Sequence, residues 1–374
     1  MNKGKKFNSI GRKPRILVAP LDWGLGHTTR CIPIINELIC QNCEVYIAAE
    51  GAAALLLQDQ FLTPTFLPLK GYRVRYSKKT FFHLGLLFQV PKVIIAMYHE
   101  HRWLSKIIRE HDIDGVISDN RPGLYNQKIV SVYITHQLKV ETGGRFTGKI
   151  AARIHNFFIR KFHLCWVPDD RGTGLAGKLS HPPTSANIRY IGPLSRFKKL
   201  RGIKKEIECL ILLTGPEPQR SIFEKIIFRE LRNIEINVLV VRGLPGESKM
   251  PAFPGGFVRI VNHLSAADLN YAMQQSEIIV SRSGYTTVMD IVKIEQKSIL
   301  VPTPGQTEQE YLARHLYEMG ICFSINQENF SLEKAIRDSK GFGFNFPAVD
   351  MEQYKSAVTE FIHSLDSNNF TRHT

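Results

Sequence analysis

The chain alternates short β-rich runs with helical segments, and this order of elements constrains its fold more than any other feature. In the first half, the run RILVAP from Arg15 leads through the loop LDWGLGH into a helical stretch that begins near Thr28. A second β-rich run, EVYIAAE, follows directly. Strand, helix and strand in this order form a βαβ unit, which requires parallel pairing and a right-handed crossover. The sequence therefore predicts an α/β fold.

The alternation continues through the first half and restarts after residue 206. Further strands of the first half are predicted at residues 114–118, 129–135 and 163–168. In the second half the predicted strands are ECLILLTG, NVLVVRG, EIIVS and KSILVP, and the predicted helices run through FEKIIFREL, near AADLNYAMQ, after SRSG and through EQEYLARHLYEMG. Each half thus has the pattern of a doubly wound, Rossmann-like domain.

A division into two domains agrees with the length of the chain. Its 374 residues, 43% of them hydrophobic, are enough for two cores. Residues 191–206 are short of apolar side chains and dense in Lys and Arg, which predicts a solvated connector. The predicted division is a basic tail over 1–14, a first domain over 15–192, a linker over 193–206 and a second domain over 207–374, with the last helix a candidate to pack back on the first domain. Two such domains leave a cleft facing the carboxyl ends of both sheets, where open α/β sheets bind ligands.

Charge and apolar content bear on where the protein resides. A formal net charge of +15 attracts any polyanion, whether nucleic acid, an anionic membrane surface or a phosphorylated substrate. Six cysteines without paired spacings predict reduced thiols. The first fifteen residues lack the apolar stretch of a secretory signal, and Gln89, Pro91 and Lys92 interrupt the apolar run 84–98. We therefore expect a cytoplasmic protein without a transmembrane helix.

The first segment that carries chemistry is the loop before the first predicted helix. Gly24 and Gly26 allow a tight turn and a close approach of the backbone to a ligand. His27 stands where the strand gives way to the helix, at the mouth of the predicted cleft. A histidine at such a place can act as a general base near neutral pH. The alternative is a histidine that only caps or packs the helix.

A second segment, IIVSRSGYTTVMDIV, runs from Ile278 to Val292. Its strand ends at Ser281, and Ser283 and Gly284 form the turn into a helix whose first N–H groups are free to bind an anion such as a pyrophosphate. Asp290 lies further along this helix, where its carboxylate can accept hydrogen bonds from vicinal ribose hydroxyls. The alternative for Asp290 is a solvated helix carboxylate.

The third segment, ILVPTPGQTEQEYLARHL, places Gln309 and Glu310 at the start of a helix on the rim of the same cleft. Adjacent amide and carboxylate groups can exchange several hydrogen bonds with a hydroxyl-rich sugar. Capping of the helix by Thr307 and Glu310 is the competing structural explanation.

Together these motifs resemble glycosyltransferase family 28. The resemblance rests on GLGHTTRCIPIINEL, SRSGYTTVMDIV and VPTPGQTEQEYLARHL, which occur in the order of that family and span both halves. The family contains the bacterial transferase that adds N-acetylglucosamine to the lipid-linked peptidoglycan precursor, and its wider relatives are the UDP-glycosyltransferases. The resemblance implies the GT-B fold, in which two Rossmann-like domains face each other across a cleft, and a UDP-sugar donor.

The resemblance also implies a role for each matching position. The implied donor site holds the diphosphate, the ribose, the sugar and the uracil, and the implied acceptor site contains the histidine of the first loop. In that order the positions are Ser283 and Gly284; Asp290; Gln309 and Glu310; and Leu264, with Thr214 and Gly215 in a loop near the phosphates and His27 at the reacting centre. The first loop, with Gly24 and Gly26, departs from the glycine-rich loop of the peptidoglycan enzyme. The segment SDNRPG departs as well, but its Asp119 matches an aspartate that supports the histidine in some wider relatives.

The preferred reaction is an in-line displacement at the anomeric carbon that inverts its configuration, with His27 as base and Asp119 holding the imidazolium. Neither a metal nor a cofactor is expected, since no D-x-D flanked by strands occurs and a helix terminus can supply the positive field. Two alternatives stay open: a nucleotide-sugar epimerase or hydrolase of the same fold, and a basic nucleic-acid-binding protein, although no nucleic-acid-binding motif accompanies the charge.

A membrane contact is predicted in the first half. An apolar cluster follows a run of basic residues, a pairing that suits an anionic bilayer surface. The apolar side chains are Phe81, Phe82, Leu84, Leu87 and Phe88, and the basic ones are Arg73, Arg75, Lys78 and Lys79. Because the peptidoglycan enzyme meets a lipid-linked acceptor through its N-terminal half, we expect peripheral binding to the inner face of the cytoplasmic membrane and a lipid-linked or lipid acceptor. A buried helix beside a solvated basic loop is the alternative.

Overall fold

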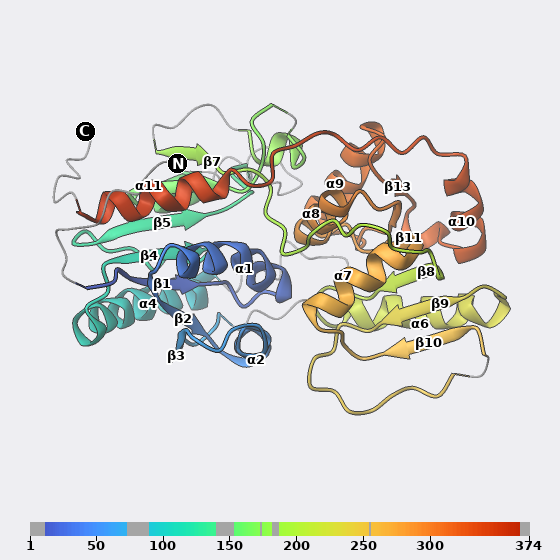
Figure 1. Cartoon of the computed structure of the whole chain (residues 1–374), viewed down its shortest axis with the longest axis horizontal. Coiled ribbons are helices and arrows are strands. Elements are labelled where there is room, and N and C mark those ends of the chain that lie inside the picture. Colours follow the sequence, from blue (N-terminus) through green and yellow to red (C-terminus); the bar gives the residue numbers. More distant parts are fainter. Residues whose placement is uncertain are drawn as a thin grey trace.

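A computed structural model describes residues 12–72, 90–139, 153–172, 174–181, 187–253 and 256–366. These residues form two parallel β-sheets that lie side by side, each covered by helices (Figure 1). The predicted apolar segment 81–88, with its Phe81, Phe82, Leu84, Leu87 and Phe88, lies outside the described residues. The predicted α/β class with two doubly wound halves is confirmed.

The first sheet has seven strands in the order β3-β2-β1-β4-β5-β6-β7, and all its pairings are parallel. Its strands are β1 (Arg15–Ala19), β2 (Glu44–Ala49), β3 (Thr65–Pro68), β4 (Gly115–Asp119), β5 (Val130–Ile134), β6 (Leu164–Val167) and β7 (Ile188–Tyr190). The second sheet has six parallel strands in the order β10-β9-β8-β11-β12-β13. Its strands are β8 (Ile207–Leu212), β9 (Val238–Val241), β10 (Val258–Val261), β11 (Ser276–Ser281), β12 (Ser298–Leu300) and β13 (Phe323–Ser324).

Helices cover both faces of each sheet (Figure 1). On the first sheet, α1 (Leu25–Cys40), α2 (Gly51–Gln60) and the last helix α11 (Tyr354–Asp366) pack on one face, and α4 (Val90–His111) packs on the other. On the second sheet, α7 (Ala266–Gln275), α8 (Tyr285–Ile294) and α9 (Thr307–Glu318) pack on one face, and α6 (Gln219–Glu230) and α10 (Leu332–Lys340) on the other.

Alternate residues of the central strands enter the two core layers. In β1, Ile16 and Val18 belong to the layer under α1 and α11, whereas Leu17 and Ala19 belong to the layer under α4. All four are fully buried. A strand buried on both faces reads as an uninterrupted apolar run, which is why RILVAP is recognisable in the sequence.

The strand order reverses beside the first strand of each sheet. The chain passes from β1 to β2 on one side and later returns to β4 on the other, and it does the same from β8 to β9 and then to β11. Such a switch point opens a crevice at the carboxyl ends of the two strands concerned, because their connections run to opposite sides. The segments after β1, β4, β8 and β11 therefore form the natural places for ligand contacts.

Residues 191–206 and the segment between α10 and α11 join the two sheets. Part of residues 191–206 is buried. Residues 191–206 form no regular structure, as predicted, but the expectation of a solvated connector is wrong for its first half. Ile191 and Leu194 are buried in the core layer beneath α11, and Phe197 is buried in the core of the second sheet. The connector has to cross between two cores, so its few apolar side chains anchor it at both ends. Only residues 198–206 are mainly exposed.

Two further findings concern the described helices. No helix in the described ranges combines the length and the apolar character needed to cross a bilayer. Helix α1 begins at Leu25, three residues before the predicted Thr28, so His27 lies inside its first turn.

Candidate active site

Helix α1 presents His27 at the carboxyl edge of the first sheet. The chain turns from β1 into α1 at Gly24, which has a φ of 90° and caps the helix without a side-chain hydrogen bond. This positive φ favours glycine, because a Cβ would clash with the neighbouring carbonyl. The His27 side chain is mostly buried, with 17% of its surface exposed.

His27 contacts Asp119, the last residue of β4. The His27 Nδ1 and Asp119 Oδ1 atoms are 3.1 Å apart, and the carboxylate is fully buried. The residues are 92 positions apart in the chain, but β1 and β4 pair directly, so their carboxyl ends meet. The structure therefore brings together the predicted base and the predicted supporting carboxylate.

Arg30, in the next turn of α1, contacts both His27 and Asp119, and we call these three residues the His27 cluster. Its Nε donates to Asp119 Oδ2 at 2.6 Å, and a second nitrogen of the guanidinium donates to Asp119 Oδ1. Burial alone would raise the pKa of Asp119, but the charges of Arg30 and His27 outweigh it and hold that pKa well below its ordinary range. Asp119 is therefore ionised at any physiological pH.

The environment of His27 favours its neutral form. Burial lowers the pKa of the imidazole, and the positive charge of Arg30 lowers it further, while Asp119 acts in the opposite direction. The net shift is downward from 6.5. With the Nδ1 hydrogen directed to Asp119, the unprotonated Nε2 can accept a proton. Arg30 also lies 2.9 Å from Nδ1 and would favour the other tautomer, so the two partners compete for this nitrogen.

A second histidine links the cluster to the second sheet. Arg30 donates to Nδ1 of His136 at 2.9 Å. Because arginine cannot accept a hydrogen bond, Nδ1 of His136 is the acceptor, and Nε2 carries the hydrogen that it donates to Glu308 Oε1 at 2.8 Å. Gln137 donates to the other oxygen of Glu308. Glu308 lies in the first turn of α9, so these contacts tie the carboxyl edges of the two sheets together.

The start of α8 contacts the first turn of α1 and the segment after β5. The Tyr285 ring stacks on the His136 ring, with centroids 4.0 Å apart and an interplanar angle of 14°. Its neighbour Thr286 donates through Oγ1 to the Gly26 carbonyl at 3.1 Å. A Cβ on Gly26 would lie 3.1 Å from the Thr286 hydroxyl, so glycine permits this close approach. The predicted phosphate-binding terminus thus lies against the segment that carries His27.

At that terminus, Gly284 is the N-cap of α8 and has no atom within 4 Å of the place where a Cβ would stand. Ser283 is fully buried, and its hydroxyl donates to the Gln309 carbonyl at 2.8 Å. The Gln309 side chain accepts from the Thr303 N–H at 3.0 Å. Ser283 and Gln309 therefore brace α8 against α9, and Gly284 is the position that leaves backbone open to a ligand.

Asp290 faces the connector between the sheets. It accepts a hydrogen bond from Ser195 Oγ at 2.6 Å and lies 3.9 Å from Arg196 Nε. Burial raises its pKa to about 6, although Arg196 and Ser195 counteract the shift. The alternative of a solvated carboxylate is wrong, because Asp290 is only 5% exposed. Its role toward ribose stays a prediction.

The remaining predicted donor residues follow strands of the second sheet. Glu310 is exposed and accepts from the Gly305 N–H at 2.8 Å, a contact that caps its own loop. Thr214 and Gly215 follow β8, next to the switch point of the second sheet. Leu264 is half-buried and packs against the core of the second sheet. Of the two glutamates in the first turn of α9, Glu308 and not Glu310 contacts His136 of the first domain.

Sequence reasoning missed Arg30, His136 and Glu308. A charged residue in an apolar helix usually marks a solvated face, and nothing in the motif GHTTRC shows that Arg30 is 2% exposed.

In the described residues, no group of three or more His, Cys, Asp and Glu side chains could hold a metal ion.

Comparison with known proteins identifies the kind of enzyme. The model of the glycosyltransferase family 28 C-terminal domain matches residues 227–362. An uncharacterized glycosyltransferase of Methanosarcina acetivorans is 23% identical over 330 residues, which cover 82% of this chain and 84% of the relative. A UDP-N-acetylglucosamine--N-acetylmuramyl-(pentapeptide) pyrophosphoryl-undecaprenol N-acetylglucosamine transferase of Natranaerobius thermophilus is 22% identical over 370 residues, which cover 91% and 96%.

Solved structures give the same answer for the fold. The glycotransferase of kitacinnamycin superposes with a TM-score of 0.64 at 13% identity over 96% of this chain and 97% of the other. Acinetobacter baumannii MurG superposes with a TM-score of 0.52 at 13% identity, over 95% and 94%. The chain is a glycosyltransferase with the GT-B fold, and it resembles glycosyltransferase family 28. In this glycosyltransferase, the matched family domain includes α8 and α9, and therefore the predicted donor positions from Leu264 to Glu310.

Proposed function

We propose that this glycosyltransferase moves a sugar, with N-acetylglucosamine as the first candidate, from a UDP-sugar to a hydroxyl of a lipid-linked or other acceptor, with inversion and without a metal ion. One observation carries the proposal: the pair His27–Asp119 lies across the domain interface from the open N-terminus of α8. A base and an anion-binding helix terminus on opposite sides of one interface are the two groups that sugar transfer from a nucleoside diphosphate requires.

The chemistry follows from these two groups. His27 Nε2 takes the proton of the acceptor hydroxyl while the oxygen of that hydroxyl forms a bond to the anomeric carbon. On the opposite side of that carbon, the bond to the diphosphate oxygen breaks, so the configuration inverts. Asp119 stabilises the imidazolium that forms, because it stays ionised in its buried site. The free N–H groups at Gly284 and the first turn of α8 stabilise the departing diphosphate.

Donor recognition is assigned to the second domain. In this proposal, Asp290 accepts hydrogen bonds from the ribose, Leu264 meets the uracil, and Gln309 and Glu310 read the sugar. Glu308 belongs to the same first turn of α9 and faces the His27 cluster through His136. The Natranaerobius relative is named for UDP-N-acetylglucosamine, which supports uridine, whereas a similar spinosyn rhamnosyltransferase is complexed with thymidine diphosphate. The identity of the donor's nucleobase is therefore the first feature to test.

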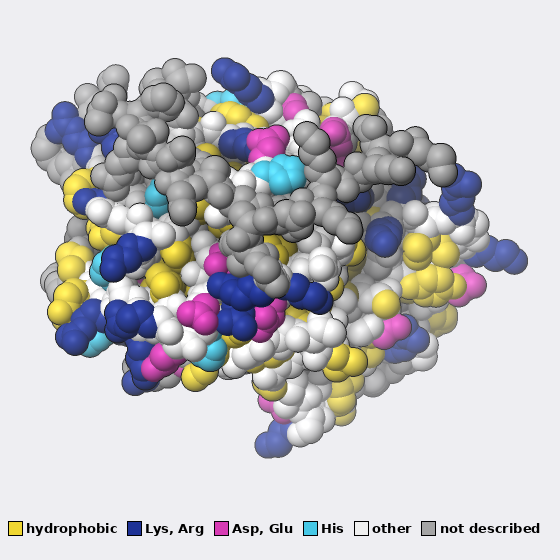
Figure 2. All heavy atoms as spheres, turned by 60° about the vertical axis from the view of Figure 1, so that its left-hand side comes forward, with side chains coloured by type: hydrophobic (Ala, Val, Ile, Leu, Met, Phe, Trp, Pro, Cys, Tyr) yellow, Lys and Arg dark blue, Asp and Glu magenta, His cyan; other side chains and the backbone are white. Residues whose placement is uncertain are grey.

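Peripheral binding to an anionic membrane and a lipid-linked acceptor remain part of the proposal. Helix α4 exposes Ile94, Ile95 and Tyr98, each between 58% and 59% exposed; we call these three residues the α4 patch. Ile94, Tyr98 and the exposed Arg102 follow each other at the i, i+4 spacing that places side chains on one face of a helix. Figure 2, which brings the first-domain end of the molecule forward, shows apolar and basic side chains close together on the described part of that end. Such a surface fits an anionic bilayer.

A binding screen followed by a transfer assay tests the proposal. Melting curves with UDP, thymidine diphosphate, GDP and their N-acetylglucosamine and glucose conjugates identify the donor, because a ligand that binds only the folded state raises the melting temperature. Release of UDP is then measured with and without candidate acceptors. Acceptor-dependent release supports transfer. Release without any acceptor in the wild-type protein would instead indicate a hydrolase or epimerase, and absence of any nucleotide effect on melting would overturn the proposal.

A further inference from the structure

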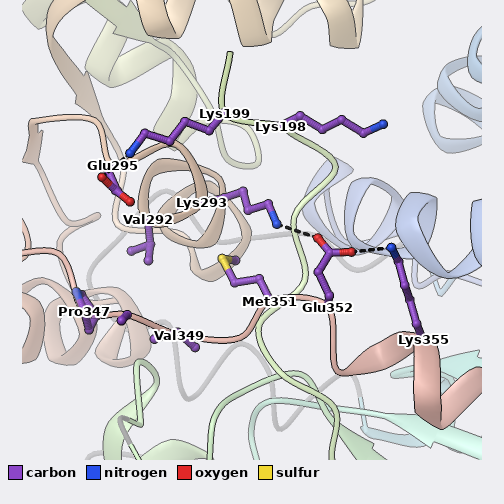
Figure 3. Close-up of a pocket in the computed structure, with 11 residues that line it drawn as sticks. Lys198, Lys199, Val292, Lys293, Glu295, Pro347, Val349, Met351, Glu352 and Lys355 are labelled. Atoms are coloured by element: carbon purple, nitrogen blue, oxygen red, sulfur yellow. Dashed lines mark hydrogen bonds and ion pairs between the residues drawn. The ribbon is translucent and has the colours of Figure 1, made fainter. Parts of the chain in front are cut away.

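A cavity of about 570 Å³ lies at the crossing between the two domains, apart from the candidate active site (Figure 3). Its walls come from four parts of the chain: the connector after β7, the end of α8, the segment that returns from α10, and the first turn of α11. Its charged lining residues are Lys198, Lys199, Lys293, Glu295, Glu352 and Lys355. Both chain segments that join the domains therefore contribute to one cavity.

Charged side chains dominate the rim of this cavity. Glu352 accepts from Lys293 at 2.7 Å and from Lys355 at 2.8 Å, and Figure 3 shows it between the two ammonium groups. Lys199 points to Glu295 and pairs with it, while Lys198 points the other way and has no ion pair among the described residues. Among the described residues that line the cavity, four lysines thus face two carboxylates, so positive charge is in excess there.

The interior of the cavity increases the effect of this charge. Val292, Val349 and Met351 form an apolar wall below the lysines. A low-dielectric wall focuses the field of nearby charges and raises the local concentration of counter-ions. A compact anion with more than one charge can contact several of these ammonium groups at once, and such charge-assisted hydrogen bonds are short and strong.

We propose that this cavity binds a phosphate-type anion, either free in solution or as a lipid headgroup, and that the bound anion ties the two interdomain segments together. Lys198 supplies an unpaired ammonium group, and Lys293 and Lys355 can share their hydrogens between Glu352 and the anion. The site is distinct from the predicted donor site. Helix α8 has ten residues and is about 15 Å long, with the donor end at Gly284 and the cavity at Val292 and Lys293.

Binding of inorganic pyrophosphate to the full-length protein provides the test. Calorimetric titrations are carried out with and without saturating UDP, so that a pyrophosphate that only enters the donor site is recognised by its loss in the presence of UDP. The double variant Lys198→Ala, Lys355→Ala is expected to lose about tenfold in affinity for pyrophosphate. Lys225→Ala removes an exposed lysine of α6 and should bind pyrophosphate like the wild type. The single variant Lys198→Glu, at an exposed position, covers the case of a double variant that does not fold.

Amide hydrogen exchange locates the bound anion. Pyrophosphate is expected to slow exchange in residues 198–206 and 346–355 and to leave the segment 283–286 unchanged when UDP is present. Vesicles of phosphatidylcholine with phosphatidic acid, compared with phosphatidylcholine alone, test the headgroup as the source. Binding of either probe that depends on Lys198 supports the site and names its source. Equal binding by wild type and lysine variants, protection confined to 283–286, or no binding of either probe would overturn the inference, and none of these outcomes depends on sugar transfer.

Discussion

Arg30 lies one helical turn after His27 and shares Asp119 with it, which gives this arginine control over the protonation of the base. Its charge keeps the carboxylate ionised and at the same time lowers the pKa of His27. A base in a buried site is useful only if it is neutral before the reaction and stabilised when it becomes charged. Arg30 provides the first condition and Asp119 the second.

Replacement of His27 separates chemistry from binding. His27→Ala is expected to lower the turnover number by about 10² to 10⁴, since this is the usual contribution of a general base. Affinity for UDP should stay within about twofold of the wild type, because the donor is assigned to the other domain. Turnover is measured by UDP release and affinity by calorimetry. His99→Ala changes an exposed histidine of α4 and serves as the control. A variant that retained most of its turnover would show that His27 is structural.

The pH dependence of kcat/KM reports the charge of His27. Because its pKa is lowered from 6.5, the neutral base is the main form at pH 7, and kcat/KM should fall only below pH 6.5. Arg30→Met removes a positive charge that lowers this pKa, so the acid limb of the profile should move to higher pH. Arg30→Lys keeps the charge and should lie nearer the wild type. An acid limb that stays in place in a folded Arg30→Met protein would contradict this account.

At the scale of elements, the sequence predicts the strands that are buried on both faces and misses those at the edges. β1, β4 and β11 each contain an uninterrupted apolar run, ILVA, GVI and IIV, because helices cover both faces of the sheet. The edge strands β3 and β10 are half-exposed and short, and β13 has two residues, so none has a distinct pattern. Pairing between neighbouring strands is what brings His27 to Asp119, and the switch-point rule together with the family resemblance anticipated it. The contact between α9 and the first domain depends on how the domains meet, which no local pattern encodes.

Asp290 is a residue of α8 and contacts Ser195 and Arg196 of the connector. Its predicted role in donor binding can therefore be tested by changing Asp290 itself or its partner Ser195. Asp290→Ala and Gln309→Ala are expected to weaken UDP-sugar affinity about 10- to 100-fold if the side chains contact the donor through charge-assisted or buried hydrogen bonds. Asp290→Ala also leaves Arg196 without its ion pair, so its melting temperature should fall. Asp290→Asn has nearly the same shape and is the variant to use if alanine unfolds the protein.

Ser195→Ala is the matched control for this pair. It removes the hydrogen bond from Ser195 to Asp290 but keeps the carboxylate. If the ribose hydroxyls bind Asp290, this variant should retain or gain affinity for UDP. Unchanged affinity in both Asp290→Ala and Gln309→Ala, measured by calorimetry on folded protein, would remove the donor-site assignment.

For the whole molecule, the contact between His136 and Glu308 is one of those that join the two domains. The carboxylate of Glu308 accepts from both His136 and Gln137, although it is part of the other domain. Glu308→Ala should therefore widen the distribution of domain orientations and raise the radius of gyration in solution scattering. Glu310 lies two residues further along the same turn, and among the described contacts its side chain bonds only to its own loop. Glu310→Ala should therefore leave the scattering unchanged. Identical scattering for Glu308→Ala and the wild type would show that other contacts hold the domains.

The last prediction concerns the membrane and depends on two segments of the first half of the chain. The α4 patch is exposed in the described structure, and the apolar segment 81–88 precedes it in the chain after a basic run. Each lysine or arginine near an anionic surface contributes about 1 kcal/mol of attraction, and burial of apolar side chains adds to it. The protein should therefore sediment with vesicles that contain phosphatidylglycerol at low salt, and less so at high salt.

Two sets of serine substitutions separate the contribution of segment 81–88 to membrane binding from that of the α4 patch. One replaces Phe81, Phe82 and Leu84, and the other replaces the α4 patch. Each set should release most of the protein from the vesicles as long as the variant remains folded. For the α4 patch, the melting temperature and UDP affinity should stay unchanged, because exposed apolar side chains contribute little to stability. Phe257→Ser removes an exposed phenylalanine of the second domain and should not affect sedimentation. If the unmodified protein does not bind phosphatidylglycerol vesicles at low salt, the membrane proposal is wrong and a soluble acceptor becomes the better candidate.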